Sequence, residues 1–332
     1  MKAIIALLLA LSSSLLSSGS YAQDATNDYF NKEREYASMS QDITLDIETR
    51  VSAVLALGQY QGANALIGIA RASRDDEAKL RVAAIEAVRG WSDLAKWDVA
   101  SPLLNDENSS VSRSAIHLLL PLQAQLNEQQ FKYLERHTER YLSSLGSALN
   151  NQLEKAQLLT LLTRYPEAEA LYHSLFDSVD KQIVNISVSL AYSQLLLQQN
   201  KTGESIAFLT QQVSVYNRNT ELSSLHYQLG ISYLKSKQLE AAQLSFGRAY
   251  GLTPTNQKFG YSYAASIQSS QPKLASDIFK QLYRDTGDPS LLYATCQSQM
   301  MASLDAKECM NRLGEIAPVE VVEQLRSEYT NS

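Results

Sequence analysis

Apolar residues recur along the chain at helical spacing, with polar turns between the blocks. From residue 49 to residue 119, three blocks align, with apolar or small residues at i+4, i+5 and i+8 from each start. The blocks start at Thr49, Leu80 and Val111 and close at Leu57, Val88 and Leu119. Second apolar segments, 63–70 and 94–104, lie between them. The pattern predicts stacked helix pairs.

Acidic turns separate these pairs. An arginine recurs near the start of the helix that follows each turn. Asp76, Arg81, Ala83 and Ala84 carry a resemblance to the shorter variety of HEAT-type repeats. This resemblance covers residues 43–122, although Ser112 stands where Arg50 and Arg81 occur in the first two blocks. We expect both arginines to pair with turn carboxylates of a neighbouring repeat, which is a structural role, in preference to binding a ligand.

A second repeat type is clearest in residues 224–254. Its signature residues are Leu229, Gly230, Tyr233, Ala242, Phe246, Ala249 and Pro254. Their spacing resembles a tetratricopeptide (TPR) repeat of ~34 residues. Small side chains at Gly230 and Ala242 let two helices cross closely, while Tyr233 and Phe246 fill the adjoining holes.

Weaker copies extend this TPR-like pattern over residues 151–332. Ala275 with Phe279, and Ala306 with Met310, repeat the Ala-x3-Phe element. With no Gly/Ser/Pro-rich linker, we expect one continuous all-α solenoid of stacked antiparallel helix pairs. The expected divisions are 1–22 signal peptide, 23–42 polar segment, 43–122 HEAT-like repeats, 123–150 connecting helices and 151–332 TPR-like repeats.

The N-terminus has the pattern of a secretory signal peptide. Lys2 precedes an apolar run, 3–11, and Ser20-Tyr21-Ala22 offers small residues at the positions where cleavage after Ala22 requires them. The apolar run is shorter than the ~20 residues of a membrane span, and no later stretch approaches that length. We therefore predict cleavage, no membrane span and location in the bacterial periplasm.

Charge and composition narrow the partners. Lys and Arg total 29 against 35 Asp and Glu, so the chain lacks the basic surplus of nucleic-acid-binding proteins. Four histidines without a close pair, and no Cys-x-x-Cys-His, predict no metal, no cofactor and no covalently bound haem. Zinc-protease, nucleophile-elbow and phosphate-loop motifs are missing as well. We expect no enzymatic activity.

Two cysteines carry the clearest chemical prediction. Cys296 and Cys309 flank a predicted helix–helix turn symmetrically, so a disulfide between them would staple the last TPR-like pair. The alternative is a redox-active or metal-binding thiol pair, which the wide spacing and the lack of a nearby histidine disfavour.

The TPR resemblance implies which residues face the concave groove. On the first helix of the clear repeat these are Ser224 and, as the main binding residues, Tyr227, Ile231, Leu234 and Lys235. On the preceding first helix they are Leu190, Gln194, Leu197 and Gln198. The expected partner is a protein or peptide held by apolar anchors. The order of repeats is also similar to the C-terminal portion of certain exported multihaem cytochromes, which implies an adaptor for an envelope or respiratory complex. Two alternatives stay open: a cell-envelope hydrolase carried on a solenoid, and a structural subunit of a larger assembly.

Overall fold

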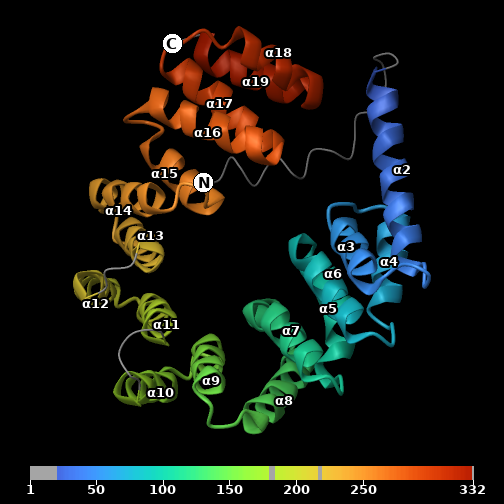
Figure 1. The fold of residues 1–332 in the computed structure, drawn as a ribbon, viewed down its shortest axis with the longest axis vertical. Coiled ribbons are helices and arrows are strands. Elements are labelled where there is room, and N and C mark those ends of the chain that lie inside the picture. Colours follow the sequence, from blue (N-terminus) through green and yellow to red (C-terminus); the bar gives the residue numbers. More distant parts are fainter. Residues whose placement is uncertain (1–20, 179–183, 216–218, 331–332) are drawn as a thin grey trace. The chain divides into compact units, whose positions relative to one another are not determined.

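The computed structural model describes residues 21–178, 184–215 and 219–330, and the regular elements within these ranges are all helical (Figure 1). The predicted all-α solenoid class is confirmed, because successive helices pack on one another in order. Contacts divide the chain into two compact units, which we call unit 1, ending at Leu145, and unit 2, beginning at Gly146. The division falls within the predicted connecting segment 123–150. Residues 1–20 of the predicted signal peptide lie outside the described residues.

Unit 1 consists of α-helices joined by short 3-10 segments. Its elements are α2 (Tyr21–Gln41), α3 (Ile47–Leu57), α4 (Ala63–Ala72), α5 (Ala78–Ala87), η2 (Val88–Gly90), α6 (Asp93–Ala100), η3 (Ser101–Asn105), α7 (Ser109–Leu119), η4 (Leu120–Gln125) and α8 (Glu128–Ser144). The aligned helices α3, α5 and α7 pack side by side in that order. Their alanine-rich stripes allow this close approach, since Ala53, Ala84 and Ala115 are all at most 1% exposed.

Polar residues at the turns start several of these helices. The Asp46 carboxylate accepts hydrogen bonds from the backbone N–H groups of Glu48 and Thr49 at the start of α3. At α8, Asn127 and Gln130 form a reciprocal capping box. Such caps satisfy backbone donors that have no partner inside the helix.

The predicted polar segment 23–42 is almost entirely helical and belongs to unit 1. As part of α2 it packs on α3 and α4. Glu33 is only 1% exposed, and its carboxylate accepts the backbone N–H of Ala65 at 2.8 Å, in the first turn of α4. Gly62 makes room for this contact, because a Cβ there would lie 2.4 Å from the Glu33 oxygens. Glu33 therefore caps a helix other than its own.

Two arginines tie neighbouring repeats of unit 1 together. Arg50 donates to Asp75 at 2.8 Å, and Arg81 donates to Asp106 at 2.7 Å, both over the same sequence separation of 25 residues. The Arg81 guanidinium also donates to the backbone carbonyl of Asp75, so it links two successive turns. Both arginines therefore pair with turn carboxylates of a neighbouring repeat.

Unit 2 is a succession of helix pairs. Its elements are α9 (Leu149–Leu161), α10 (Tyr165–Ser178), α11 (Val184–Gln198), α12 (Thr202–Val215), α13 (Asn219–Lys235), α14 (Leu239–Leu252), α15 (Gln257–Ile267), α16 (Pro272–Thr286), α17 (Pro289–Met301), α18 (Lys307–Ile316) and α19 (Val319–Thr330). Each helix contacts the next, and α9, α11 and α13 also contact one another in sequence (Figure 1). Pro272 and Pro289 occupy first helical positions, where a missing N–H costs nothing.

Four of these pairs turn in the same way. The residues in the turns, Thr163, Asn200, Lys237 and Ser303, all have φ between 55° and 62°. In each turn, the N–H of the following residue bonds back to a carbonyl five residues earlier, as Lys201 does to Leu196 at 2.8 Å. The repeated turn is a Schellman-type helix end, and it sets the same reversal in successive pairs.

The pair α13–α14 contains the predicted TPR packing residues. Leu229, Ala242, Phe246 and Ala249 are at most 5% exposed, Tyr233 is half-buried, and Pro254 is exposed beyond the end of α14. The Phe246 ring lies directly against Gly230, so a Cβ at Gly230 would be 2.6 Å from the ring. The glycine thus sets how closely the two helices approach.

Candidate peptide-binding surface

Helix α13 carries most of the predicted binding residues. Its buried side places Leu225 and Leu229 in a core cluster shared with α12. Another face has apolar residues spaced by four and three positions, which align along a helix. These are Tyr227, Ile231 and Leu234, and we call them the α13 strip. Tyr227 and Ile231 are half-buried, whereas Leu234 is 42% exposed. The α13 strip is therefore a partly exposed apolar surface on a packed helix, and Leu234 is its most open member.

The predicted groove cation has a structural partner. The Lys235 ammonium donates a hydrogen bond to the backbone carbonyl of Leu197 in the last turn of α11. This contact joins α13 to the preceding first helix, and a cation near a helix C-terminus is favourable. The Leu197 side chain is only 4% exposed, so its assignment to an open surface is corrected: it packs inside, and its backbone carbonyl accepts the bond.

The other predicted residues of α11 divide between core and surface. Leu190 is half-buried and packs against the cluster that contains Leu225 and Leu229. Gln194 is exposed, while Gln198 and, on α13, Ser224 are half-buried. Gln194 is thus the exposed member of the predicted α11 set.

Aromatic contacts connect the α13 strip to the next helix pair. The Tyr227 ring stacks on Phe259 at a centroid distance of 5.0 Å and contacts Phe246 at 5.6 Å. The ammonium of Lys258 lies 4.8 Å from the centroid of the Tyr227 ring, within the range of a cation–π contact. The Tyr227 and Ser262 hydroxyls are 3.5 Å apart. The Tyr227 side chain therefore links α13 to the start of α15.

Sequence reasoning missed Lys258 and Tyr261. Tyr261 is 39% exposed, and its ring lies 5.9 Å from Phe279, much as Tyr227 lies against Phe246 in the preceding pair. The available signal was periodicity, because Tyr261 follows Tyr227 by one repeat of ~34 residues. Lys258 gave no such signal, since its contact with Tyr227 exists only in three dimensions.

Three titratable groups inside the helices have pKa values shifted mainly by burial. Burial, then the charges of Arg140 and Arg136, lower the pKa of His137, and burial followed by Arg248 lowers that of His226. Burial raises the pKa of Tyr172 to about 12, despite a hydrogen bond to Thr160 that acts the other way. Across the described ranges, no three His, Cys, Asp or Glu side chains cluster as a metal site would require.

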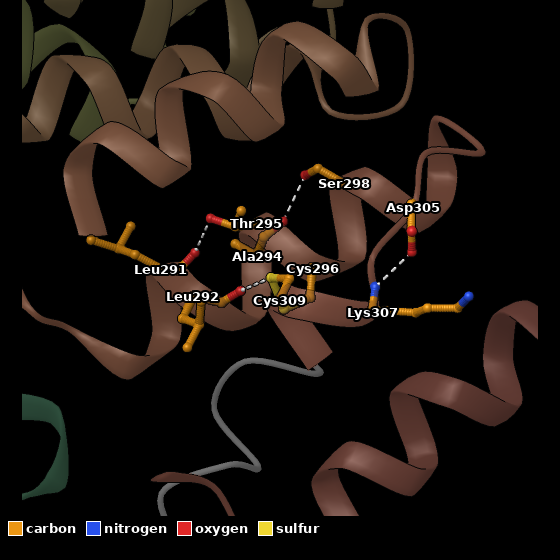
Figure 2. The surroundings of a disulfide bond; sticks show 9 residues. All are labelled: Leu291, Leu292, Ala294, Thr295, Cys296, Ser298, Asp305, Lys307 and Cys309. Atoms are coloured by element: carbon orange, nitrogen blue, oxygen red, sulfur yellow. Dashed lines mark hydrogen bonds between the residues drawn. A yellow bond between two sulfur atoms is a disulfide. The ribbon is translucent and has the colours of Figure 1, made fainter. Parts of the chain in front are cut away.

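The predicted disulfide is present in the α17–α18 pair. Figure 2 shows the two sulfur atoms bonded between these helices, with Cα atoms 5.5 Å apart. Cys296 is fully buried in a core cluster that also contains Leu292, Met310 and Leu313. The bond therefore lies within the hydrophobic contact of the pair.

Comparisons with known proteins give a structural match only. No family model matches the chain, and no curated protein matches it by sequence. Among solved structures, one match is the crystal structure of YrrB, described as a TPR protein with an unusual peptide-binding site. The match covers 57% of this chain and 97% of the YrrB chain. The identity is 13% and the TM-score 0.42. In the part of the chain that is described, no helix combines the length and apolarity needed to cross a bilayer.

Proposed function

We propose that this protein is a non-enzymatic helical-repeat scaffold that binds a segment of a partner protein along α11, α13 and α15. The observation that carries the proposal is the α13 strip, an apolar face that is partly exposed, most of all at Leu234, on a helix whose opposite side is packed. Helix pairs that stack in order hold such a face without reorganisation on binding, which lowers the entropic cost of association.

The chemistry of this surface favours a peptide with apolar anchors. Leu234 is the most exposed member of the α13 strip, Tyr227 and Ile231 flank it, and Gln194 supplies an exposed amide on α11. Aliphatic and aromatic residues at helical spacing accept the anchors of a helical or extended segment, and amides can bond its backbone. Lys235 contributes through its bond to α11 and leaves the binding surface mainly apolar.

Partner capture with matched variants tests this surface. Leu234→Ala and Tyr227→Ala should each reduce recovery of a specific partner from the exporting cell, measured by quantitative mass spectrometry. Leu244→Ala is the control, because Leu244 is 65% exposed on α14, the other helix of the same pair. Equal recovery of every partner by wild type and by both α13 variants would remove the α13 strip from the proposal.

We also propose that the chain is exported to the periplasm and serves an envelope or respiratory complex there. Support comes from the signal-like N-terminus and from the disulfide, since disulfides persist in oxidising compartments. The assignment of residues 43–122 to HEAT-like repeats is a further proposal, supported by the recurring Arg–Asp pairs. N-terminal sequencing of the mature protein should begin at Gln23; an intact Met1 in the cytoplasmic fraction would contradict export.

A further inference from the structure

We propose that a cavity between α15, α16 and α17 is a second docking pocket, which takes one apolar side chain of a bound peptide and holds an adjacent acidic residue with Lys258. The inference rests on the proposed function and adds that the bound peptide carries an acidic residue next to an apolar one. The cavity measures about 260 Å³. Its lining residues are Gln257, Lys258, Tyr261, Leu282, Thr286, Asp288, Ser290 and Leu291.

The walls of this pocket suit an apolar anchor. Leu282 and Leu291 are core residues, 4% and 7% exposed, so the positions of their side chains are set by packing before any ligand arrives. Tyr261, at 39% exposure, adds a ring to the lining. For scale, an enclosed apolar cavity of ~150 Å³ holds a benzene molecule. The larger volume here therefore admits one Leu or aromatic side chain.

Lys258 supplies a charge that has no counter-ion in the described part of the chain. Among the described residues, no carboxylate lies within ion-pair distance of its ammonium, whose recorded contact is the Tyr227 ring. Lys258 is the second residue of α15, where the positive end of the helix dipole disfavours a cation. The helix dipole therefore does not favour a lysine here; the Tyr227 ring stabilises its charge, and a carboxylate of a bound peptide would do so further.

The surroundings of Lys258 fix both its position and the polarity of the pocket. Stacking of Tyr227 on Phe259 holds the ring under the ammonium, which limits the freedom the lysine loses when it binds an anion. Asp288 enters from the turn before α17, and its carboxylate accepts the N–H of Ser290 at 2.8 Å. An acidic residue of the ligand is favoured at Lys258 and repelled at Asp288, so the pocket gives the peptide a direction.

Peptide arrays and calorimetry test this pocket with the full mature chain. The array carries end-blocked peptides with Leu, Phe or Ala as anchor and with Glu, Gln or Lys on either side, and the strongest pair is measured in solution. We expect Leu-Glu or Phe-Glu peptides to bind at least tenfold more tightly than their Gln counterparts. Equal binding of Glu and Gln peptides, or no binding above the Ala peptides, would overturn the pocket.

Variants separate recognition from folding. Lys258→Glu removes a cation from the first turn of α15 and also its contact with the Tyr227 ring, and these two effects oppose each other, so thermal unfolding should change little. Affinity for the Glu peptide should fall at least tenfold, and affinity for the Lys peptide should rise. Lys280→Glu makes the same charge change at an exposed position of α16 outside the pocket and should alter neither affinity. Gln257→Trp should fill the exposed mouth and weaken all anchored peptides. Unchanged peptide affinities in Lys258→Glu would contradict the inference.

Two further arms identify the occupant and keep this proposal distinct from the previous one. Benzoate, an aromatic carboxylate with no peptide backbone, should not compete at the concentrations where the peptide binds; competition would make the pocket a small-acid site. Binding that responds to Leu234→Ala but not to Lys258→Glu would reject the pocket and keep the α13 strip. The reverse pattern would reject the α13 strip and keep the pocket.

Discussion

The ring of Phe246 lies so close to Gly230 that a Cβ on the glycine would be 2.6 Å from two of the ring carbons. The two residues come from α13 and α14, and Phe246 is only 2% exposed. With the ring enclosed by Tyr227 and the pair's core, it has little room to retreat. The contact therefore sets the spacing of the two helices whose outer face carries the α13 strip.

Gly230→Ala should destabilise unit 2. The added methyl group must displace the Phe246 ring, and overpacking of this kind costs about 1–3 kcal/mol, which outweighs the ~0.5–1 kcal/mol that alanine gains over glycine inside a helix. Urea unfolding followed by far-ultraviolet circular dichroism measures the change. The control is Gly251→Ala on α14, where the surrounding space is open and alanine should stabilise the helix by about 0.5–1 kcal/mol. Equal effects of both substitutions would show that the Gly230 contact is not close.

Arg81→Met should destabilise unit 1 by about 2 kcal/mol. The Arg81–Asp106 pair is nearly buried, with side chains 15% and 9% exposed. The free energy of unfolding lost with this pair should therefore be larger than for an exposed ion pair and smaller than for one in the core. Burial acts to raise the Asp106 pKa, but bonds from Arg81 and the Asn108 N–H and the charge of Arg81 outweigh it and lower the pKa. The stability from this pair is thus present above about pH 4 and lost on acidification.

Tryptophan fluorescence reports the urea unfolding of unit 1 separately from that of unit 2, because both tryptophans of the chain, Trp91 and Trp97, belong to unit 1. Lys79→Met is the matched control, since it removes an equally charged side chain whose partner, Glu48, is exposed. It should leave the urea midpoint nearly unchanged. A shift as large as that of Arg81→Met would mean that burial of the Arg81 pair is unimportant.

How far sequence reasoning reached depends on whether an interaction is periodic. The Gly230–Phe246 packing and the arginines at equivalent repeat positions follow from spacing, because equivalent residues in a repeat meet equivalent neighbours. Glu33 does not recur, and its role as a cap for α4 depends on where α2 folds back. Lys258 likewise meets Tyr227 only after two pairs have stacked.

The error at Leu197 has a related cause. On α11, the helical phase transferred from a degenerate copy places Leu197 on the open face, but its side chain is 4% exposed. A run of three leucines, 195–197, gives little periodic contrast to fix that phase. The apolar residues of α13 alternate more clearly with polar ones, and its strip is correspondingly open.

Acid should weaken unit 1 through His137. The imidazole is 7% exposed, its Nδ1 has no hydrogen-bond partner among the described residues, and its pKa is lowered by burial and by Arg140 and Arg136. As pH falls below about 6.5, the unfolded chain takes up a proton that the folded chain resists, so the free energy of unfolding decreases. Tryptophan-monitored urea midpoints at pH 7.5 and 5.5 measure this. His137→Gln should reduce the difference, and an unchanged difference would show that another group causes it.

The left-handed turn residues predict a stabilising substitution. Thr163, at φ 59°, is β-branched, and a left-handed conformation costs such a residue about 1–2 kcal/mol. Thr163→Gly should therefore raise the stability of unit 2 by about 1 kcal/mol in urea unfolding. Asn200 has the same conformation in the next turn, but asparagine tolerates it, so Asn200→Gly should change little. A destabilised Thr163→Gly protein would show that the threonine side chain compensates for its strained backbone.

The disulfide should stabilise the end of unit 2 because it lowers the conformational entropy of the unfolded chain. Cys296 and Cys309 are 13 residues apart, and a loop of about that size is worth ~3 kcal/mol in the chain-entropy model. The double variant Cys296→Ala/Cys309→Ala should therefore lower the unfolding temperature and speed amide exchange in α17, α18 and α19 more than in α9 and α10. Reduction of the wild type should reproduce the effect, while the same reductant should leave the double variant unaffected. Since the chain contains only these two cysteines, a thiol count decides the premise: two reactive thiols in the unreduced, denatured protein would rule the bond out.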